Sequence, residues 1–328
     1  MNLEYLSARL AGMRSEFVTD AGFDLVCSGR DIHSAANIMA KSIFRAGIDE
    51  QGGATQKQLL SAVERGRSEI IKKTAALVRN CIPRHLGLIF SRLEMEQIKE
   101  AARHVALPRP IRFPRPSFIR LADCADWTEE WGKCGTMAEF KTLLSTVRHP
   151  LAGGFDPAQS GGRLEKSLET HYFGNFVKNF RKLSEDETAF FSDMNDLVNI
   201  NSACAADRMS NLATQYFFTD GIGRIDKEGF SKLCAVTGAE FQSTASKLAG
   251  LKFAYRSGPG GFSQSLLRAY LTKWKIRNIV RPMGILDPLL FLEELNAQAA
   301  NLKLAINAVT RTTAAVEPEN YLIYGKIA

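Results

Sequence analysis

The hydrophobic residues of this 328-residue chain recur mostly at steps of three and four, the spacing of helices with one buried face. Between residues 30 and 47, one face collects Ile32, Ala35, Ala36, Met39, Ile43 and Phe44. The same spacing predicts a helix over residues 56–78 and another over residues 86–106. Because the residue before a proline avoids the helical region, the first of these should stop before the segment Cys81–Ile82–Pro83.

The C-terminal half shows the same period. One stripe of the segment 162–183 holds Leu164, Leu168, Tyr172, Phe176 and Phe180. Two helix starts carry a capping box, a Ser or Thr followed three residues later by Glu: Thr136 with Glu139, and Ser184 with Glu187. Strand-like runs are few and lie near residues 251 and 321. The expected fold class is therefore all-α, or nearly so.

The last long helix is predicted to start with Asp287 as its N-cap and Pro288 at its first position. Its apolar residues alternate steps of three and four and form a seam that includes Leu292, Leu295, Leu302 and Ile306. Few charges flank this seam. Two interpretations stay open, namely a helix packed in its own bundle and a helix that contacts another subunit.

A connector rich in proline and arginine interrupts the helical pattern. Residues 107–121 hold four prolines and four arginines in fifteen positions, so this segment should be extended. Its arginines are Arg109, Arg112, Arg115 and Arg120. They form either an arm for an acidic partner or part of a strap whose apolar residues pack on its own domain. The Gly- and Pro-rich stretch 149–162 is the best candidate boundary.

The predicted organisation is two helical lobes joined by this connector. The N-terminal lobe covers residues 1–106, and the C-terminal lobe covers residues 163–328. The part between them, 107–162, combines the Pro/Arg strap, short helices and the Gly/Pro-rich linker.

The stretch FFTDGIGRIDKEGFSKL, residues 217–233, resembles the second half of an EF-hand. Gly223 takes the place of the loop's sixth residue and Ile225 that of its eighth. A second copy follows 37 residues later with Gly260 and Phe262, so the resemblance covers about residues 212–272. A weaker pair over residues 43–102 starts from Gly53. The resemblance implies helix–loop–helix hairpins that pack in pairs.

Calcium is not expected in these loops. Ca²⁺ takes six to eight oxygen ligands, several of them from carboxylates. The ligand places of the first loop hold Phe218, Asp220, Ile222 and Gly229, and those of the second hold Tyr255, Ser257, Pro259 and Leu266. The hydrophobic residues of the pattern are kept while most ligands are missing. We therefore expect hairpins that serve packing and bind no metal.

The net charge gives a weak indication of the partners that the chain could bind. The net charge of +7 favours acidic partners such as nucleic acid, anionic lipid or an acidic protein face. In residues 268–281 the cations Arg268, Lys273, Lys275, Arg277 and Arg281 alternate with Tyr270 and Trp274. This mixture can grip single-stranded nucleic acid, or it can be the solvated face of a helix with a short apolar stripe.

Motifs for chemistry are not found in the sequence. The five histidines show no i, i+4 pair and no HExxH, and there is no GxSxG, P-loop or GxGxxG. Asp193 and Asp196 could hold a metal, but acidic residues early in a helix are explained by the helix dipole. We expect no catalytic residue, metal or cofactor. Scattered cysteines, no signal peptide and no membrane-spanning run indicate a cytoplasmic, reduced protein.

The sequence is most typical of a non-enzymatic helical interaction or structural subunit of a larger assembly. The residues expected to contact a partner are Arg109, Arg112, Arg115, Lys273, Lys275 and Arg277. One alternative is an RNA- or DNA-associated accessory protein that uses the same cations. A second is an enzyme whose catalytic residues are dispersed along the chain, since such sets are recognised by geometry.

Overall fold

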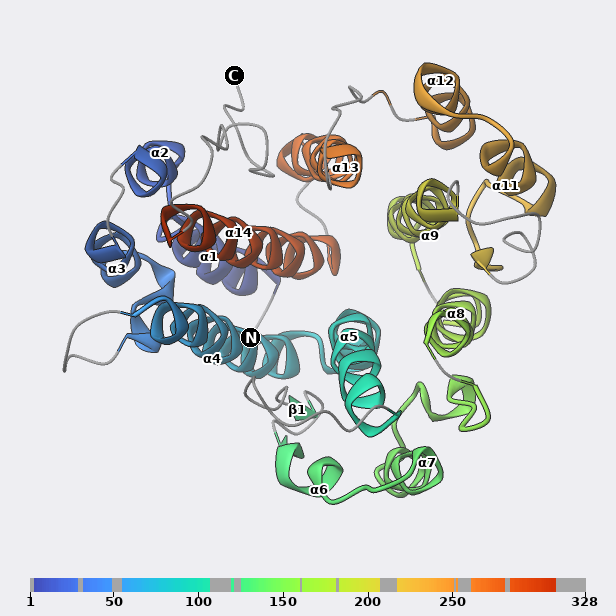
Figure 1. Cartoon of the computed structure of the whole chain (residues 1–328), viewed down its shortest axis with the longest axis horizontal. Helices are drawn as coiled ribbons and strands as arrows, with labels where there is room; N and C mark the ends of the chain where they lie inside the picture. Colours follow the sequence, from blue (N-terminus) through green and yellow to red (C-terminus); the bar gives the residue numbers. More distant parts are fainter. Residues whose placement is uncertain are drawn as a thin grey trace. The chain divides into compact units, whose positions relative to one another are not determined.

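The computed structural model describes residues 3–28, 32–48, 55–106, 119–120, 125–159, 161–180, 183–206, 217–250, 252, 261–280 and 284–310. Within these residues the fold is all-α in character, as predicted (Figure 1). The strand structure described is a two-residue antiparallel pair, β1 (Ile119–Arg120) with β2 (Ala125–Asp126). No described helix is both long and apolar enough to cross a membrane.

The chain divides into two compact units, and the first contains both ends of the chain. The first unit is Met1–Ile82 with Phe253–Ala328, and the second is Pro83–Lys252. This division differs from the predicted lobes 1–106 and 163–328. The physical reason is that the last helix packs on the N-terminal helices, which a reading along the chain cannot show.

The first unit is built around its last helix. Its elements are α1 (Leu3–Arg14), α2 (Asp20–Ser28), α3 (Ile32–Ala40), the 3₁₀ turn η1 (Ile43–Gly47), α4 (Gln56–Cys81), α13 (Gly261–Val280) and α14 (Leu286–Thr310). α14 contacts α1, α2, α3, α4 and α13 (Figure 1). The seam residues Leu292, Leu295, Leu302 and Ile306 are at most 3% exposed. They lie in the core of this unit, where α14 packs against the other helices.

Helix α14 starts differently from the prediction. It begins at Leu286, so Asp287 lies inside the first turn instead of capping it. The Asp287 carboxylate accepts a hydrogen bond from Arg14 Nη1 at 2.6 Å, and Arg14 Nε donates to Glu294 at 2.7 Å. Burial lowers the pKa of Arg14, but Glu294 and Asp287 outweigh this effect and raise it overall. The buried ion triad therefore joins α1 to α14.

The predicted helix over residues 30–47 is broken at its centre. α3 ends at Ala40, and the Ser42 hydroxyl accepts from the Phe44 N–H to start η1. A Cβ on Gly47 would come within 1.9 Å of the Ala62 carbonyl oxygen, so η1 packs directly against the backbone of α4. α4 opens with a capping box at Thr55. It includes Cys81 and so continues beyond the predicted end at Val78, but it stops before Pro83, in agreement with the effect expected of that proline.

The second unit consists of shorter elements. They are η2 (Pro83–His85), α5 (Leu86–Ala106), α6 (Thr128–Gly132), α7 (Met137–Thr146), η3 (Ala152–Gly154), α8 (Gly162–Thr170), the π-helical turn η4 (His171–Val177), α9 (Glu185–Ala206), α11 (Lys227–Cys234) and α12 (Gly238–Ala249). Aromatic side chains dominate its core, among them Phe140, Phe155, Tyr172, Phe173, Phe190 and Phe191. Ser184 and Glu187 form the predicted capping box in both directions at the start of α9.

Charged pairs fix α8 on α5. Lys99 Nζ lies 2.6 Å from Glu169 Oε1, and Arg103 Nη2 lies 2.6 Å from Glu165 Oε1. Glu165 and Glu169 are one helical turn apart, so they share a face of α8. Both carboxylates of α8 are thus paired with cations of α5, and the second oxygen of Glu169 accepts from the Thr219 hydroxyl at 3.2 Å.

Candidate functional site

The C-terminal turn of α13 holds the three cations of 268–281 that the sequence favoured. Its buried stripe includes Leu266, Tyr270, Leu271 and Trp274. On the other side, Lys275, Ile276 and Arg277 are all exposed, and Ile276 is 58% exposed. We call Lys273, Lys275, Ile276 and Arg277 the α13 surface. It combines an exposed apolar side chain with a cation on each side.

The cations of the α13 surface are held by their neighbours. Lys273 Nζ and Arg277 Cζ each lie 5.4 Å from the ring centroid of Trp274, a distance at which a cation is attracted to the ring. Lys275 Nζ lies 3.7 Å from Glu294. Trp274 is fully buried, so it acts as a fixed support on which the two flanking side chains rest.

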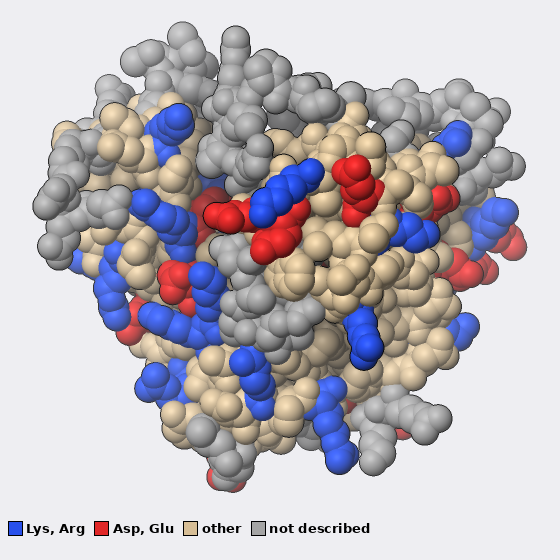
Figure 2. Space-filling view, turned by 90° about the horizontal axis from the view of Figure 1, so that it is seen from below, with Lys and Arg blue, Asp and Glu red and all other residues tan. Residues whose placement is uncertain are grey.

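The aromatic residues of this helix are not available to stack on bases. Tyr270 is 2% exposed and Trp274 is 0% exposed. A single strand bound here could therefore be held by phosphate contacts with the cations, and not by the aromatic stacking that the sequence suggested. On the face shown in Figure 2, Lys and Arg side chains are spread over the surface with Asp and Glu among them.

The other predicted contact residues cannot be placed. Arg109, Arg112 and Arg115 lie outside the described residues, as does most of the strap 107–121. Both interpretations of the strap, the arm and the packed connector, stay predictions.

The EF-hand-like segment 217–226 is tied to α9 by side chains of that helix. Asn199 accepts from the Thr219 N–H at 2.7 Å and donates to the Thr219 carbonyl at 3.0 Å. Asn195 accepts from the Gly223 N–H at 2.9 Å, and Asp196 accepts from the Ile225 N–H at 2.9 Å. These bonds engage the backbone of Thr219, Gly223 and Ile225. The segment is therefore held against α9 by its backbone.

The turn's glycine is required by this close packing. A Cβ on Gly223 would lie 2.6 Å from Asp196 Oδ1, closer than real side chains come. Ile225, two residues later, is 3% exposed. The Gly-x-Ile pattern thus has a purely structural explanation here.

An arginine of this turn pairs with two carboxylates of α9. Arg224 Nη2 lies 2.5 Å from Asp193 Oδ1, and Arg224 Nε lies 3.0 Å from Asp196 Oδ2. Arg224 also donates to the Ala249 carbonyl. Burial raises the pKa of Asp196, and hydrogen bonds from Ile225 and Arg224 partly offset this. Asp193 and Asp196, the residues considered for a metal, are paired with a guanidinium.

The described residues contain no group of three or more His, Cys, Asp or Glu that could hold a metal ion. The second EF-hand-like loop, 255–266, lies mostly outside the described residues, and so does Gly53 of the weaker N-terminal copy. The relation to EF-hands and the absence of bound calcium stay predictions.

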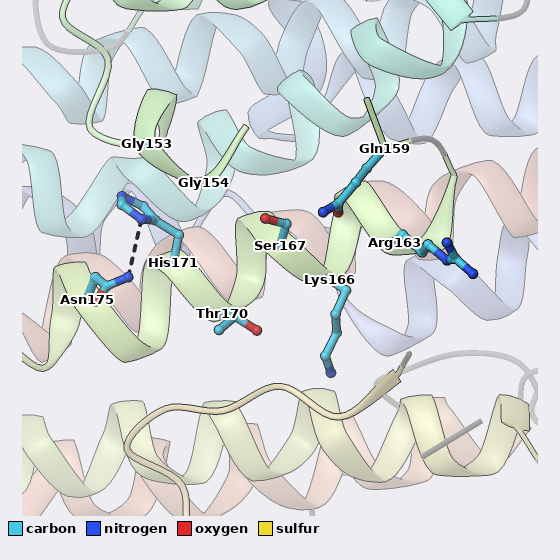
Figure 3. Close-up of a pocket in the computed structure, with 9 residues that line it drawn as sticks. All are labelled: Gly153, Gly154, Gln159, Arg163, Lys166, Ser167, Thr170, His171 and Asn175. Atoms are coloured by element: carbon cyan, nitrogen blue, oxygen red, sulfur yellow. Dashed lines mark hydrogen bonds between the residues drawn. The ribbon is translucent and has the colours of Figure 1, made fainter. Parts of the chain in front are cut away.

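A polar groove of about 510 Å³ runs along α8 in the second unit (Figure 3). We call it the α8 groove. It is lined by Gly153, Gly154, Gln159, Arg163, Lys166, Ser167, Thr170, His171 and Asn175. The η3 turn supplies the two glycines, and the other residues come from the loop before α8, from α8 and from the π-helical turn after it.

The π-helical turn sets the position of His171. Its Nε2 lies 3.1 Å from the Pro150 carbonyl, which can only accept, so Nε2 carries the proton and Nδ1 is left as an acceptor. The Asn175 amide lies 3.4 Å from Nδ1 and donates to it. A Cβ on Gly154 would come within 2.4 Å of His171 Cβ, so the η3 turn rests directly on this residue. Because both ring nitrogens are engaged, His171 shapes the groove and is not poised as a general base.

Lys166 has the most perturbed environment of the groove. Figure 3 shows its side chain pointing to the opposite side of α8 from Gln159. Its ammonium donates to the Phe217 carbonyl and, at 2.8 Å, to the Thr219 hydroxyl. The Phe218 and Phe230 rings lie 5.6 and 6.0 Å away. Burial lowers the pKa of Lys166 to about 7, against a smaller opposing effect of Glu169.

Sequence reasoning missed both Lys166 and the groove. Lys166 lies between Leu164 and Leu168 and has the pattern of an ordinary solvated residue. Its contacts come from residues 217–219, about fifty positions away, and no local pattern announces them. His149 is a satisfied core residue whose Nε2 lies 2.8 Å from Glu94 Oε2.

Comparison with known proteins does not assign the chain to a family. No protein-family model matches the chain, and no curated protein matches it. What can be said of function therefore depends on the surfaces described above.

Proposed function

We propose that this chain is a non-enzymatic helical interaction protein, a subunit of a larger assembly, and that the α13 surface contacts an acidic face of a protein partner. The observation that carries the proposal is the exposure of Ile276, 58%, between the exposed cations Lys275 and Arg277. An apolar side chain with arginine beside it is the composition favoured at interface centres.

The fixed geometry of the α13 surface supports the same conclusion. Binding costs free energy when flexible side chains must be ordered. Lys273 and Arg277 already rest on the buried Trp274 ring, so part of that ordering is present before the partner arrives. Covering Ile276 would add roughly 1 kcal/mol of hydrophobic stabilisation.

Two other parts of the proposal come from the sequence. Arg109, Arg112 and Arg115 of the strap are proposed as further contacts with the same acidic partner. We also propose a cytoplasmic, reducing location, which is supported among the described residues by four cysteines that form no disulfide: Cys81, Cys134, Cys204 and Cys234.

The test compares two triple variants of equal chemistry. The first, Lys275→Gln with Ile276→Ser and Arg277→Gln, removes the α13 surface. The control, Lys41→Gln with Leu25→Ser and Lys57→Gln, removes the same charge and a similar exposed apolar side chain elsewhere in the first unit, since Leu25 is 61% exposed and both lysines are exposed. Capture of the partner should be lost in the first variant and kept in the control. Equal capture by both would remove the α13 surface from the proposal.

Nucleic acid is the competing candidate, and the observation that favours it is the three cations within residues 273–277. Phosphate contacts release counterions, so such a complex weakens steeply as salt rises. A contact anchored by Ile276 depends less on salt, because apolar burial is not screened. An enzyme with a dispersed catalytic set stays a third alternative.

A further inference from the structure

The α8 groove is a second feature, independent of the α13 surface and placed wholly within the second unit. We infer that the α8 groove binds a small, hydroxyl-bearing molecule through a negatively charged oxyanion group, a phosphate or a carboxylate. The inference does not depend on the function proposed above.

The chemistry of the lining is that of hydrogen-bond donors. Arg163 supplies a guanidinium, Ser167 and Thr170 supply hydroxyls, and Gln159 and Asn175 supply amides. A guanidinium is the side chain best suited to planar or tetrahedral oxyanions, because its N–H groups form a fixed fork. Hydroxyls and amides serve equally for the hydroxyl groups of a ligand.

Negative charge is kept out of the groove by the way α8 is paired. The described lining contains no Asp or Glu. The two carboxylates of α8, Glu165 and Glu169, are bound to Arg103 and Lys99 of α5. On the loop side, the Asp156 carboxylate accepts from the Gln159 amide at 3.0 Å. The described lining therefore offers the Arg163 guanidinium and neutral donors, while the Lys166 ammonium is bound to Phe217 and Thr219.

The groove is also held in shape. Gly153 and Gly154 lie so close to His171 that a Cβ on either would come within 2.8 Å of its side chain. His171 is fixed in turn by Pro150 and Asn175. A single π-helical turn of this kind is often found at functional sites. Preformed walls lower the ordering cost of binding a small ligand.

The volume and the lining residues of the α8 groove limit the chemical class of its ligand. A volume of about 510 Å³ is in the range of small-molecule sites and much exceeds one oxyanion. Among the described lining residues, the aromatic ring is that of His171, and it lies against the η3 glycines. Because this ring is covered, a nucleotide base would have no ring of the described lining to stack on. A phosphorylated or carboxylated polyol therefore fits the groove better than a nucleotide.

The experiment titrates the full chain with inorganic phosphate, glycerol phosphate and gluconate, each against chloride at matched ionic strength. Binding is followed by calorimetry and by the NMR signals of the Gln159 and Asn175 side-chain amides. Three variants accompany the wild type: Arg163→Gln removes the cation, Ser167→Leu fills the groove, and Arg84→Gln removes an exposed arginine of the same unit outside the groove. Thr170→Leu is a second filling variant if Ser167→Leu unfolds.

We expect saturable binding of at least one probe, with shifts of both amide signals. Affinity should fall about tenfold or more in Arg163→Gln, as for loss of a charge-assisted hydrogen bond, and vanish in the filling variant. Arg84→Gln should bind like the wild type. Preference for the phosphates or for gluconate identifies the oxyanion. The inference is overturned if no probe shows saturable binding. It is also overturned if Arg163→Gln and the filling variants bind the probe as strongly as the wild type.

Discussion

The guanidinium of Arg224 lies 3.0 Å from the carboxylate of Asp196, on the turn that resembles a calcium loop. Asp193 lies 2.5 Å from the same guanidinium. The positive charge beside this loop is thus supplied by the protein itself. A turn with an EF-hand's glycine and isoleucine is stabilised here by the ion pairs of Arg224 and by hydrogen bonds to side chains of α9.

Removing this guanidinium should destabilise the second unit. Arg224→Met leaves Asp193 and Asp196, which are 7% and 1% exposed, without their cation. Because Arg224 is itself partly exposed, we expect a loss of about 2 kcal/mol in the free energy of unfolding, less than for a fully buried pair. Denaturant unfolding measures it. Lys232→Met, which breaks an exposed pair with Glu228, is the control and should leave the stability essentially unchanged.

Calcium should have no effect on the wild-type protein. The carboxylates beside the loop, Asp193 and Asp196 of α9, are paired with Arg224, and the first and twelfth places of the loop hold Phe218 and Gly229. The unfolding midpoint should therefore be the same in millimolar calcium and in chelator. Thermal unfolding in both conditions tests this expectation. A calcium-dependent rise of the midpoint would show that the resemblance to EF-hands includes their ligand chemistry.

Lys166 should make stability depend on pH in the alkaline range. Its folded pKa of about 7 lies below the ordinary value of 10.5, so between these values the unfolded chain binds a proton that the folded chain does not. Stability therefore rises as pH increases from about 7 toward 10, and the contribution is lowest below 7. The difference in the free energy of unfolding between wild type and Lys166→Met should change by about 1–3 kcal/mol between pH 7 and pH 10. An exposed lysine replaced in the same unit, Lys178→Met, should show no such change; a flat difference for Lys166→Met contradicts the assignment.

Arg14 should be essential to the first unit. Arg14→Met leaves Asp287 and Glu294, each 4% exposed, as buried carboxylates, and we expect a loss of about 3–5 kcal/mol. The matched control is Arg45→Met, whose pair with Glu16 is largely exposed and should matter by less than about 1 kcal/mol. Equal effects of the two substitutions in denaturant unfolding would show that the triad does not stabilise α1 on α14.

Gly154 should tolerate no side chain. Its added Cβ would lie 2.4 Å from His171 Cβ, so Gly154→Ala must displace either the η3 turn or the π-helical turn. A cost of about 1–3 kcal/mol is expected, as for overpacking. Gly135→Ala, whose Cβ meets its nearest neighbour at 3.7 Å, should be nearly neutral. Thermal unfolding of both variants decides whether the groove wall is as tight as described.

Local signals in the sequence predicted local structure well. The capping box at Ser184 and Glu187, the helix ending before Pro83 and the seam around Leu295 depend on residues within a turn or two of one another. Helical period and capping chemistry are properties of a single helix, so they can be read without knowing its neighbours.

Long-range contacts were out of reach of the same reasoning. The burial of the α14 seam on α4 unites the two ends of the chain in one unit, and the sequence pattern could not choose this over another partner. The environment of Lys166 depends on the Phe217 carbonyl and on Thr219, and that of Asp196 on Arg224. The candidate sites are made of such contacts, which explains why the groove was not predicted.

The most direct test of the proposed function is the native mass and the absorbance ratio of the complex isolated from its source cells at low and at high salt. The account predicts protein subunits that stay bound at high salt and are lost in the variant of Lys275, Ile276 and Arg277. A free monomer at both salts, or nucleic acid that leaves as the salt rises, would contradict it.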